Sequence, residues 1–147
     1  MATRSPLGKI RDALAVNLAK CTVANGYGWD VTLLTGAVTE DKLIERAPAS
    51  ALECGVSTQE FQPDKSARVT TPWTIYGTVR NTPNVDPESL GLDLIDDLAT
   101  AMIKDFRQGQ TATLTTAQTS VLGYIDEQRS IVAVMLEIET VHHIQYA

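Results

Sequence analysis

The segment over residues 69–107 most narrowly limits what this chain can fold into. Apolar and hydroxyl side chains alternate over 69–80, which is the pattern of a strand with one buried face. Pro72 donates no ladder hydrogen bond, so we expect this strand to begin near Pro72 or to lie at an edge there. Asp86 and Pro87 then provide a cap and a first-turn proline for an amphipathic helix over 87–107. The segment predicts a strand followed by a helix that covers a sheet.

The flanking segments predict one more helix and several more strands. Ser5 and Pro6 begin a helix over 6–22, and alternate side chains predict a strand over 27–34. Short strands are expected at 51–56 and 121–126, and a turn at 126–130. The most apolar strand is expected at 131–141, and its first half is apolar on both faces, which predicts a central position in the sheet.

The order of these elements predicts the fold class. Helix, strands, helix and strands follow one another, and no helix separates the paired strands as a parallel crossover would require. We therefore expect an α+β fold, in which two main helices pack on a mostly antiparallel sheet. The 147 residues form a single domain, 1–147, in this interpretation.

Two long polar segments, 35–48 and 57–68, are expected to be loops, the first with or without one helical turn. Each holds large apolar residues with few apolar neighbours in the sequence. Leu43, Ile44 and Phe61 are therefore candidates for a subunit contact, and packing within the chain is the alternative. Trp29 and Trp73 are expected in the core or at an interface, which the sequence does not separate.

The charge balance limits the class of partner. The chain has 12 Lys and Arg against 18 Asp and Glu, for a net charge of −6. This balance argues against general affinity for nucleic-acid phosphates or anionic lipid. No apolar run reaches the roughly 18 residues of a membrane span, and residues 1–6 do not resemble a secretory signal. We therefore expect no membrane partner, and synthesis in a cytoplasm.

Cysteine and histidine patterns predict no metal or cofactor site. Cys21 and Cys54 are interpreted as small buried apolar residues. His142 and His143 are adjacent in a predicted strand, so they point to opposite faces and are expected at a solvated strand end. The glycine-rich run 25–28 precedes a strand, whereas phosphate-binding loops follow one. We expect no catalytic, cofactor-binding or metal-binding residues, and hence no enzyme.

Two groups of carboxylates are candidates for a functional surface. Glu137 and Glu139 share one strand face with Cα atoms about 6.6 Å apart. They could act as acid and base or hold a cation, although a surface patch is the favoured interpretation. Asp93, Asp96 and Asp97 share one helix face, which is either solvated or directed toward a basic partner.

The arrangement resembles the tail terminator family of long-tailed bacteriophages, also called minor tail or tail completion proteins. Three stretches carry the resemblance: NGYGWDVTLL (25–34), TPWTIYGTVR (71–80) and the helix DPESLGLDLIDDLATAMIKDF (86–106). An apolar C-terminal strand follows, and the length also fits. Most of the chain takes part in this pattern.

The resemblance implies a subunit that assembles into a ring, typically of six, at the head-proximal end of the virion tail. Such a ring caps the tail tube, ends its polymerisation and joins the tail to the head-side connector, or neck, protein. Assembly takes place in the host cytoplasm. DNA passes through the channel without sequence-specific binding, and an acidic wall suits this passage because it repels phosphates. Either Glu137 with Glu139, or Asp93 with Asp96 and Asp97, would then face the channel or a partner.

Three alternatives stay open at this stage. The chain could be another head-tail joining or neck protein. It could be a small ligand-binding domain or an enzyme that uses Glu137 and Glu139, which predicts loss of activity on Glu137→Gln. It could also be a soluble dimeric regulator built on the same α+β frame.

Overall fold

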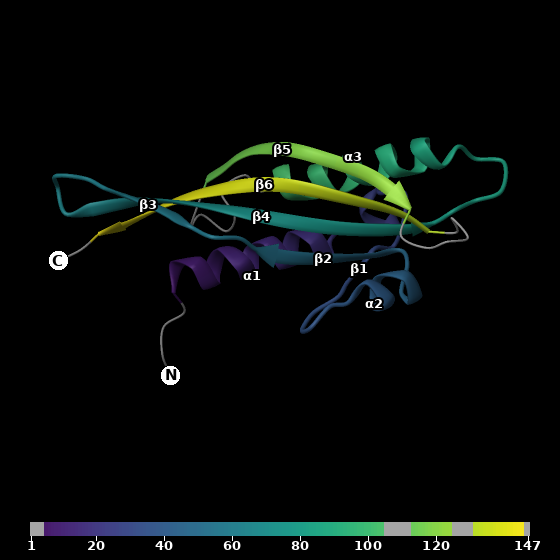
Figure 1. The fold of residues 1–147 in the computed structure, drawn as a ribbon, viewed down its shortest axis with the longest axis horizontal. Helices are drawn as coiled ribbons and strands as arrows, with labels where there is room; N and C mark the ends of the chain where they lie inside the picture. Colours follow the sequence, from purple (N-terminus) through teal and green to yellow (C-terminus); the bar gives the residue numbers. More distant parts are fainter. Residues whose placement is uncertain (1–4, 105–112, 125–130, 146–147) are drawn as a thin grey trace.

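The computed structural model describes residues 5–104, 113–124 and 131–145 (Figure 1). Its elements, in chain order, are α1 Pro6–Ala19, the 3-10 turn η1 Val23–Asn25, β1 Thr32–Leu33, α2 Glu40–Glu45, β2 Ala49–Cys54, β3 Thr58–Phe61, β4 Ser66–Arg80, α3 Pro87–Ile103, β5 Thr113–Tyr124 and β6 Ile131–Gln145. The strands form one sheet in the order β1-β2-β4-β6-β5, and β3 also pairs with β4. All these pairings are antiparallel except β1 with β2. The predicted α+β fold with a mostly antiparallel sheet is confirmed.

The two main helices begin where their caps predict. The Ser5 Oγ accepts a hydrogen bond from the Gly8 N–H at 3.1 Å, and an Asp86 carboxylate oxygen accepts one from the Glu88 N–H at 3.3 Å. These bonds satisfy amide groups that lack a partner in the first helical turn. Helix α1 ends at Ala19, three residues before the expected end. Helix α3 is described to Ile103, and the rest of its predicted span, 105–107, lies outside the described residues.

Helices α1 and α3 cover the same face of the sheet, and the core lies between them and β4 and β6. Apolar side chains from both helices are fully buried there with alternate residues of the strands: Ile10, Leu14, Leu18, Leu94, Leu98, Met102, Trp73, Ile75, Val79, Val132, Val134, Leu136 and Ile138. The Trp73 indole N–H donates to the Thr140 hydroxyl at 2.8 Å. This bond satisfies two polar groups that burial would otherwise leave without partners.

Gly77 marks the closest approach of α3 to the sheet. A Cβ atom at this position would lie 2.8 Å from Leu98 Cδ1, 3.1 Å from Val134 Cγ2 and 3.3 Å from Leu94 Cδ2. These distances are below the optimum of about 3.5–4.0 Å for carbon contacts. The helix therefore sits against β4 at a separation that requires glycine.

Strand β6 is central, as its apolar sequence predicts. It pairs with β4 along its whole length and with β5 on its other side. It continues beyond the expected end at 141 to Gln145. Strand β5 begins at Thr113 rather than 121, so the threonine-rich residues 113–120 are part of the strand. The turn expected at 126–130 lies outside the described residues.

Strand β4 begins at Ser66, so the expectation that it begins near Pro72 is wrong. The N–H and C=O of one residue in an antiparallel strand point toward the same neighbour. The Pro72 carbonyl accepts from the Gly55 N–H at 2.8 Å, so the missing N–H faces the β2 side of the strand. There the pairing with β2 ends at Cys54 and the pairing with β3 begins at Thr58. Pro72 therefore lies between the two pairings, where neither β2 nor β3 requires an N–H donor from β4.

The second expected loop, 57–68, contains a hairpin instead. Strand β3 pairs with the start of β4, and the Gln62 N–H donates to the Ser66 carbonyl at 2.9 Å across the turn. Lys65 adopts a positive φ of 62° in this turn. Figure 1 shows that β3 and the adjoining ends of β4 and β6 extend beyond α1 and α3. We call residues 58–70 the hairpin arm.

The strand expected over 27–34 is reduced to β1, two residues long. The rest of the segment is held by individual contacts rather than by a ladder: the Gly28 N–H donates to the Asp97 carboxylate at 2.9 Å, and the Val31 N–H donates to the Cys21 carbonyl at 3.0 Å. Tyr27 and Val31 are nevertheless buried. In the first expected loop, the helical turn is present as α2.

Candidate functional site

The sheet has a second face, opposite α1 and α3, that α2 alone among the described helices covers in part. We call it the open face. In β2, β4 and β6 it carries the side chains that alternate with the core residues, because neighbouring residues of a strand point to opposite faces. Its members in the middle of the sheet are Ala49, Ala51, Glu53, Pro72, Thr74, Tyr76, Thr78, Ala133, Met135, Glu137 and Glu139. Arg68 and Arg80 lie toward the two ends of β4, outside this stretch. Within it the charged residues are all glutamates, so the middle of the open face is acidic.

Glu137 and Glu139 lie on the open face, as the alternation of β6 predicts. Glu137 is the register partner of Thr74, and Glu139 is the register partner of Pro72. Both side chains are half-buried. Glu53 on β2 is also a register partner of Thr74, on the opposite side of β4 from Glu137. Three carboxylates from two strands therefore share one region of the face.

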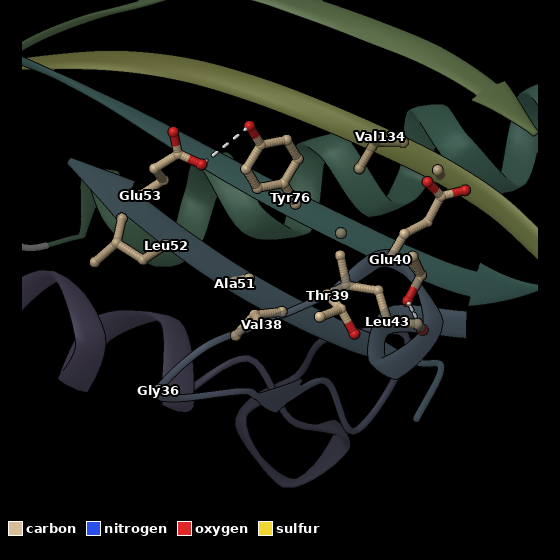
Figure 2. Close-up of a pocket in the computed structure, with 13 residues that line it drawn as sticks. Gly36, Val38, Thr39, Glu40, Leu43, Ala51, Leu52, Glu53, Tyr76 and Val134 are labelled. Atoms are coloured by element: carbon tan, nitrogen blue, oxygen red, sulfur yellow. Dashed lines mark hydrogen bonds between the residues drawn. The ribbon is translucent and has the colours of Figure 1, made fainter. Parts of the chain in front are cut away.

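Tyr76 reports the electrostatic character of this region. Its hydroxyl donates to the Glu53 carboxylate at 3.4 Å (Figure 2). Burial raises the pKa of the Tyr76 hydroxyl, and the charge and hydrogen bond of Glu53 and the charge of Glu137 raise it further. Each negative neighbour opposes formation of a tyrosinate. The open face thus disfavours added negative charge.

A cavity of about 450 Å³ lies between the open face and the segment that contains α2. Figure 2 shows Leu43 and Glu40 of α2 on one side of it and Tyr76 on the sheet. Its described lining is mainly apolar and small: Gly36, Val38, Thr39, Glu40, Leu43, Ala51, Leu52, Glu53, Tyr76, Gly77, Thr78, Ala133 and Val134. The Thr78 hydroxyl donates to the Leu43 carbonyl at 2.8 Å, which ties the end of α2 to β4. This hydrogen bond holds the α2 side of the cavity against the sheet.

The three apolar residues singled out from the loops have different positions. Leu43 lines the cavity and Ile44 is half-buried on the same short helix, so both pack within the chain in part. Phe61 is 71% exposed on the hairpin arm. Sequence reasoning missed Val56, which is also exposed, and Tyr76, whose place in an alternating strand gave no sign of a cavity above it.

The aspartates of α3 lie on the other side of the sheet from Glu137 and Glu139. Asp93 and Asp96 are exposed, whereas Asp97 is half-buried and accepts the Gly28 N–H at 2.9 Å. Together with Gly28 and Trp29 they line a shallow depression. The structure brings the three aspartates together, but it separates them from the β6 glutamates. One wall of a channel therefore cannot carry both the α3 aspartates and the β6 glutamates.

The expected solvated strand end at the two histidines is wrong for His142. Its side chain is only 3% exposed and lies on the same face of β6 as the core residue Ile138, whereas His143 is exposed on the opposite face. Burial lowers the pKa of His142, and the charge of His143 lowers it further. Over the described ranges, no group of three or more His, Cys, Asp or Glu side chains is placed to hold a metal ion.

The two cysteines differ in their exposure to solvent. Cys21 is buried as expected, and burial raises the pKa of its thiol to about 11, with a further increase from the charge of Asp97. Cys54 is exposed, so that expectation is wrong. It is the last residue of β2, where the strand leaves its pairing with β4.

The geometry defines an α+β protein with one helix-covered sheet face, one open face with an acidic middle and a projecting hairpin. No protein-family model matches the chain, and no curated protein matches its sequence. In the described part of the chain, no helix is both long enough and apolar enough to span a membrane.

Proposed function

We propose that this chain is a non-enzymatic structural subunit of the tail terminator type. In this proposal it forms a ring, with six as the expected number, that caps the tail tube of a long-tailed phage and ends its polymerisation. The tail tube protein and the head-side connector are its partners, and DNA passes through the channel. Its location is the head-proximal end of the virion tail.

The acidic middle of the open face is the observation that supports this proposal most. It is formed by regular strands, its charged residues are glutamates, and the pKa of Tyr76 is raised partly by Glu53 and Glu137. A wall of this kind repels phosphates and lets DNA slide without sticking. In the proposed ring the part of the open face around Glu137 and Glu139 therefore lines the channel, and the helix-covered face lies on the outside.

The first test is the absolute mass in solution. Six copies of a 15.9 kDa chain have a mass of about 95 kDa. Light scattering over a concentration series, with and without tail tubes of the phage that encodes the chain, should detect a closed species near this mass. A chain that stays monomeric or dimeric even with tube ends present contradicts the proposal. Tube capping is measured as a limit on tube length by electron microscopy, and a ring that joins the neck without limiting the tube would instead be a neck protein.

The second test separates the two acidic groups. The variant Glu137→Lys/Glu139→Lys reverses two charges on the open face, and Asp93→Lys/Asp96→Lys makes the same change of charge on α3. Rings with the β6 reversal should retain DNA and reduce infectivity, while rings with the α3 reversal should not. Unchanged infectivity of the β6 variant contradicts the assignment of the open face to the channel. DNA retention by the α3 variant alone would place the helix side there instead.

A further inference from the structure

An exposed aromatic side chain and an apolar cavity lie at different places on one molecule. Phe61 on the hairpin arm is 71% exposed. The cavity beside α2 has Val38, Leu43 and Tyr76 among its lining residues. Large aromatic residues are the typical anchors of protein interfaces, and they insert into pockets of the partner.

The distance along β4 prevents Phe61 from reaching the cavity of its own molecule. Ala67 is the register partner of Phe61, and Tyr76 follows it nine residues later in the same strand. At about 3.3 Å per residue, the two positions are roughly 30 Å apart. Both lie within a continuous ladder between β4 and β6, so the arm does not bend back.

A contact between one patch and a different patch of an identical copy has a geometric consequence. When the same two copies do not also make the reverse contact, the interface is heterologous, and its repetition produces a ring when the rotation closes. An aromatic residue on the arm and a cavity about 30 Å away fit this description. In a two-fold dimer, by contrast, the arm of each copy would have to enter the cavity of the other at the same time.

One cation of the arm suits the charge of the cavity. The charged residues among the described cavity lining are two glutamates, and the arm carries two cations, Lys65 and Arg68, with two acids, Glu60 and Asp64. Of the arm's acids, Asp64 accepts hydrogen bonds from its own turn, and Glu60 is the register partner of Arg68. Lys65 in the turn is thus placed to approach the carboxylates at the cavity.

From these observations we infer that Phe61 of one copy inserts into the cavity lined by Val38, Leu43 and Tyr76 of the next copy. This inference rests on the proposed ring, and it names the contact by which neighbouring subunits associate. The occupant of the cavity is the hairpin arm of a second copy, rather than a tube protein or a small ligand.

The contact can be tested by photo-cross-linking of the full chain. A benzophenone-bearing phenylalanine replaces Phe61, and the same residue replaces Val56 as the matched control, since Val56 is also exposed but lies before the arm. Mass spectrometry of the cross-linked species should join position 61 to residues 36–43 or to Tyr76 of another copy. An adduct at another surface of the chain, or only with the tube protein, overturns the inference.

Assembly by substituted variants gives a second measurement. Phe61→Ala should raise the concentration needed for half-assembly at least about 30-fold, because buried anchors contribute this much or more. Val38→Glu should weaken assembly from the side of the cavity, whereas Val56→Ala should not. If the unsubstituted chain forms the ring and Phe61→Ala assembles equally well, this contact is wrong and the proposed function stands. If the unsubstituted chain forms no ring even with tube ends present and no cross-link appears, both fail.

Discussion

Replacement of Gly77 by alanine is expected to destabilise the fold through one added methyl group. The new Cβ would meet Leu98 Cδ1 at 2.8 Å, Val134 Cγ2 at 3.1 Å and Leu94 Cδ2 at 3.3 Å. All three neighbours belong to the buried core, and they come from both α3 and β6. Because the neighbours lie on two elements, a movement that relieves one contact does not relieve the others.

The expected magnitude follows from the cost of an overpacked core. Inserting one methylene into a well-packed site lowers the free energy of unfolding by about 1–3 kcal/mol. With a urea dependence of about 2 kcal/mol/M, the unfolding midpoint should fall by about 0.5–1.5 M. As a control, Gly28→Ala places its Cβ 3.4 Å from an Asp97 oxygen, and should change the free energy by less than about 0.5 kcal/mol.

A double-mutant cycle tests the reasoning itself. Leu98→Ala alone should cost about 2–5 kcal/mol because it leaves a cavity. It also removes the atom that the added Cβ at position 77 would meet most closely, so the double variant should lose less than the sum of the two single losses, by about 0.5 kcal/mol or more. Equilibrium unfolding in urea, followed by circular dichroism, measures all four proteins. Additive losses would show that the contact with Leu98 is not the cause.

Three further predictions concern polar groups. Trp73→Phe should lower the free energy of unfolding by about 1–3 kcal/mol in urea titrations, because the buried Thr140 hydroxyl loses its donor; Trp73→Phe with Thr140→Val should recover part of this loss, and no recovery would contradict the role of the bond. The pKa of His142 is lowered in the folded state, so its contribution to the free energy of unfolding should be complete above the unfolded pKa of about 6.5 and should be lost as the pH falls from there through the folded pKa. Urea unfolding at several pH values should show this dependence, and the same dependence in His142→Gln would refute it. Glu53→Gln should lower the pKa of Tyr76, followed by the ultraviolet absorbance of tyrosinate, whereas an unchanged titration would exclude Glu53 as a cause.

Local signals in the sequence were sufficient for the starts of the two main helices and for the alternation of β4 and β6. Ser5 and Asp86 cap the helices because a side-chain oxygen there meets free amide groups regardless of the rest of the fold. The alternation in β6 predicted both its buried face and the position of Glu137 and Glu139 on the other. These features depend on residues close together in the chain.

The features that the sequence did not predict depend on distant partners. The alternation around Trp29 is that of a strand, but Asp97 and Cys21 supply the hydrogen bonds that a ladder would have supplied. His142 is buried on the face of β6 that carries the core, although it lies beyond the expected end of the strand at 141. The hairpin arm did have a local signal, since Pro63 followed by Asp64 is typical of a turn. The polar composition of β3 obscured it.

Pro72 has a consequence for the fidelity of folding. A slip of one residue in a strand pairing moves every side chain to the opposite face. Because Pro72 carries no N–H, β2 and β3 cannot merge into one continuous partner of β4 across this position. An error in the pairing of β3 with β4 therefore does not extend into the pairing of β2 with β4. On this side β4 presents two separate pairing segments, while its ladder with β6 continues unbroken through Pro72.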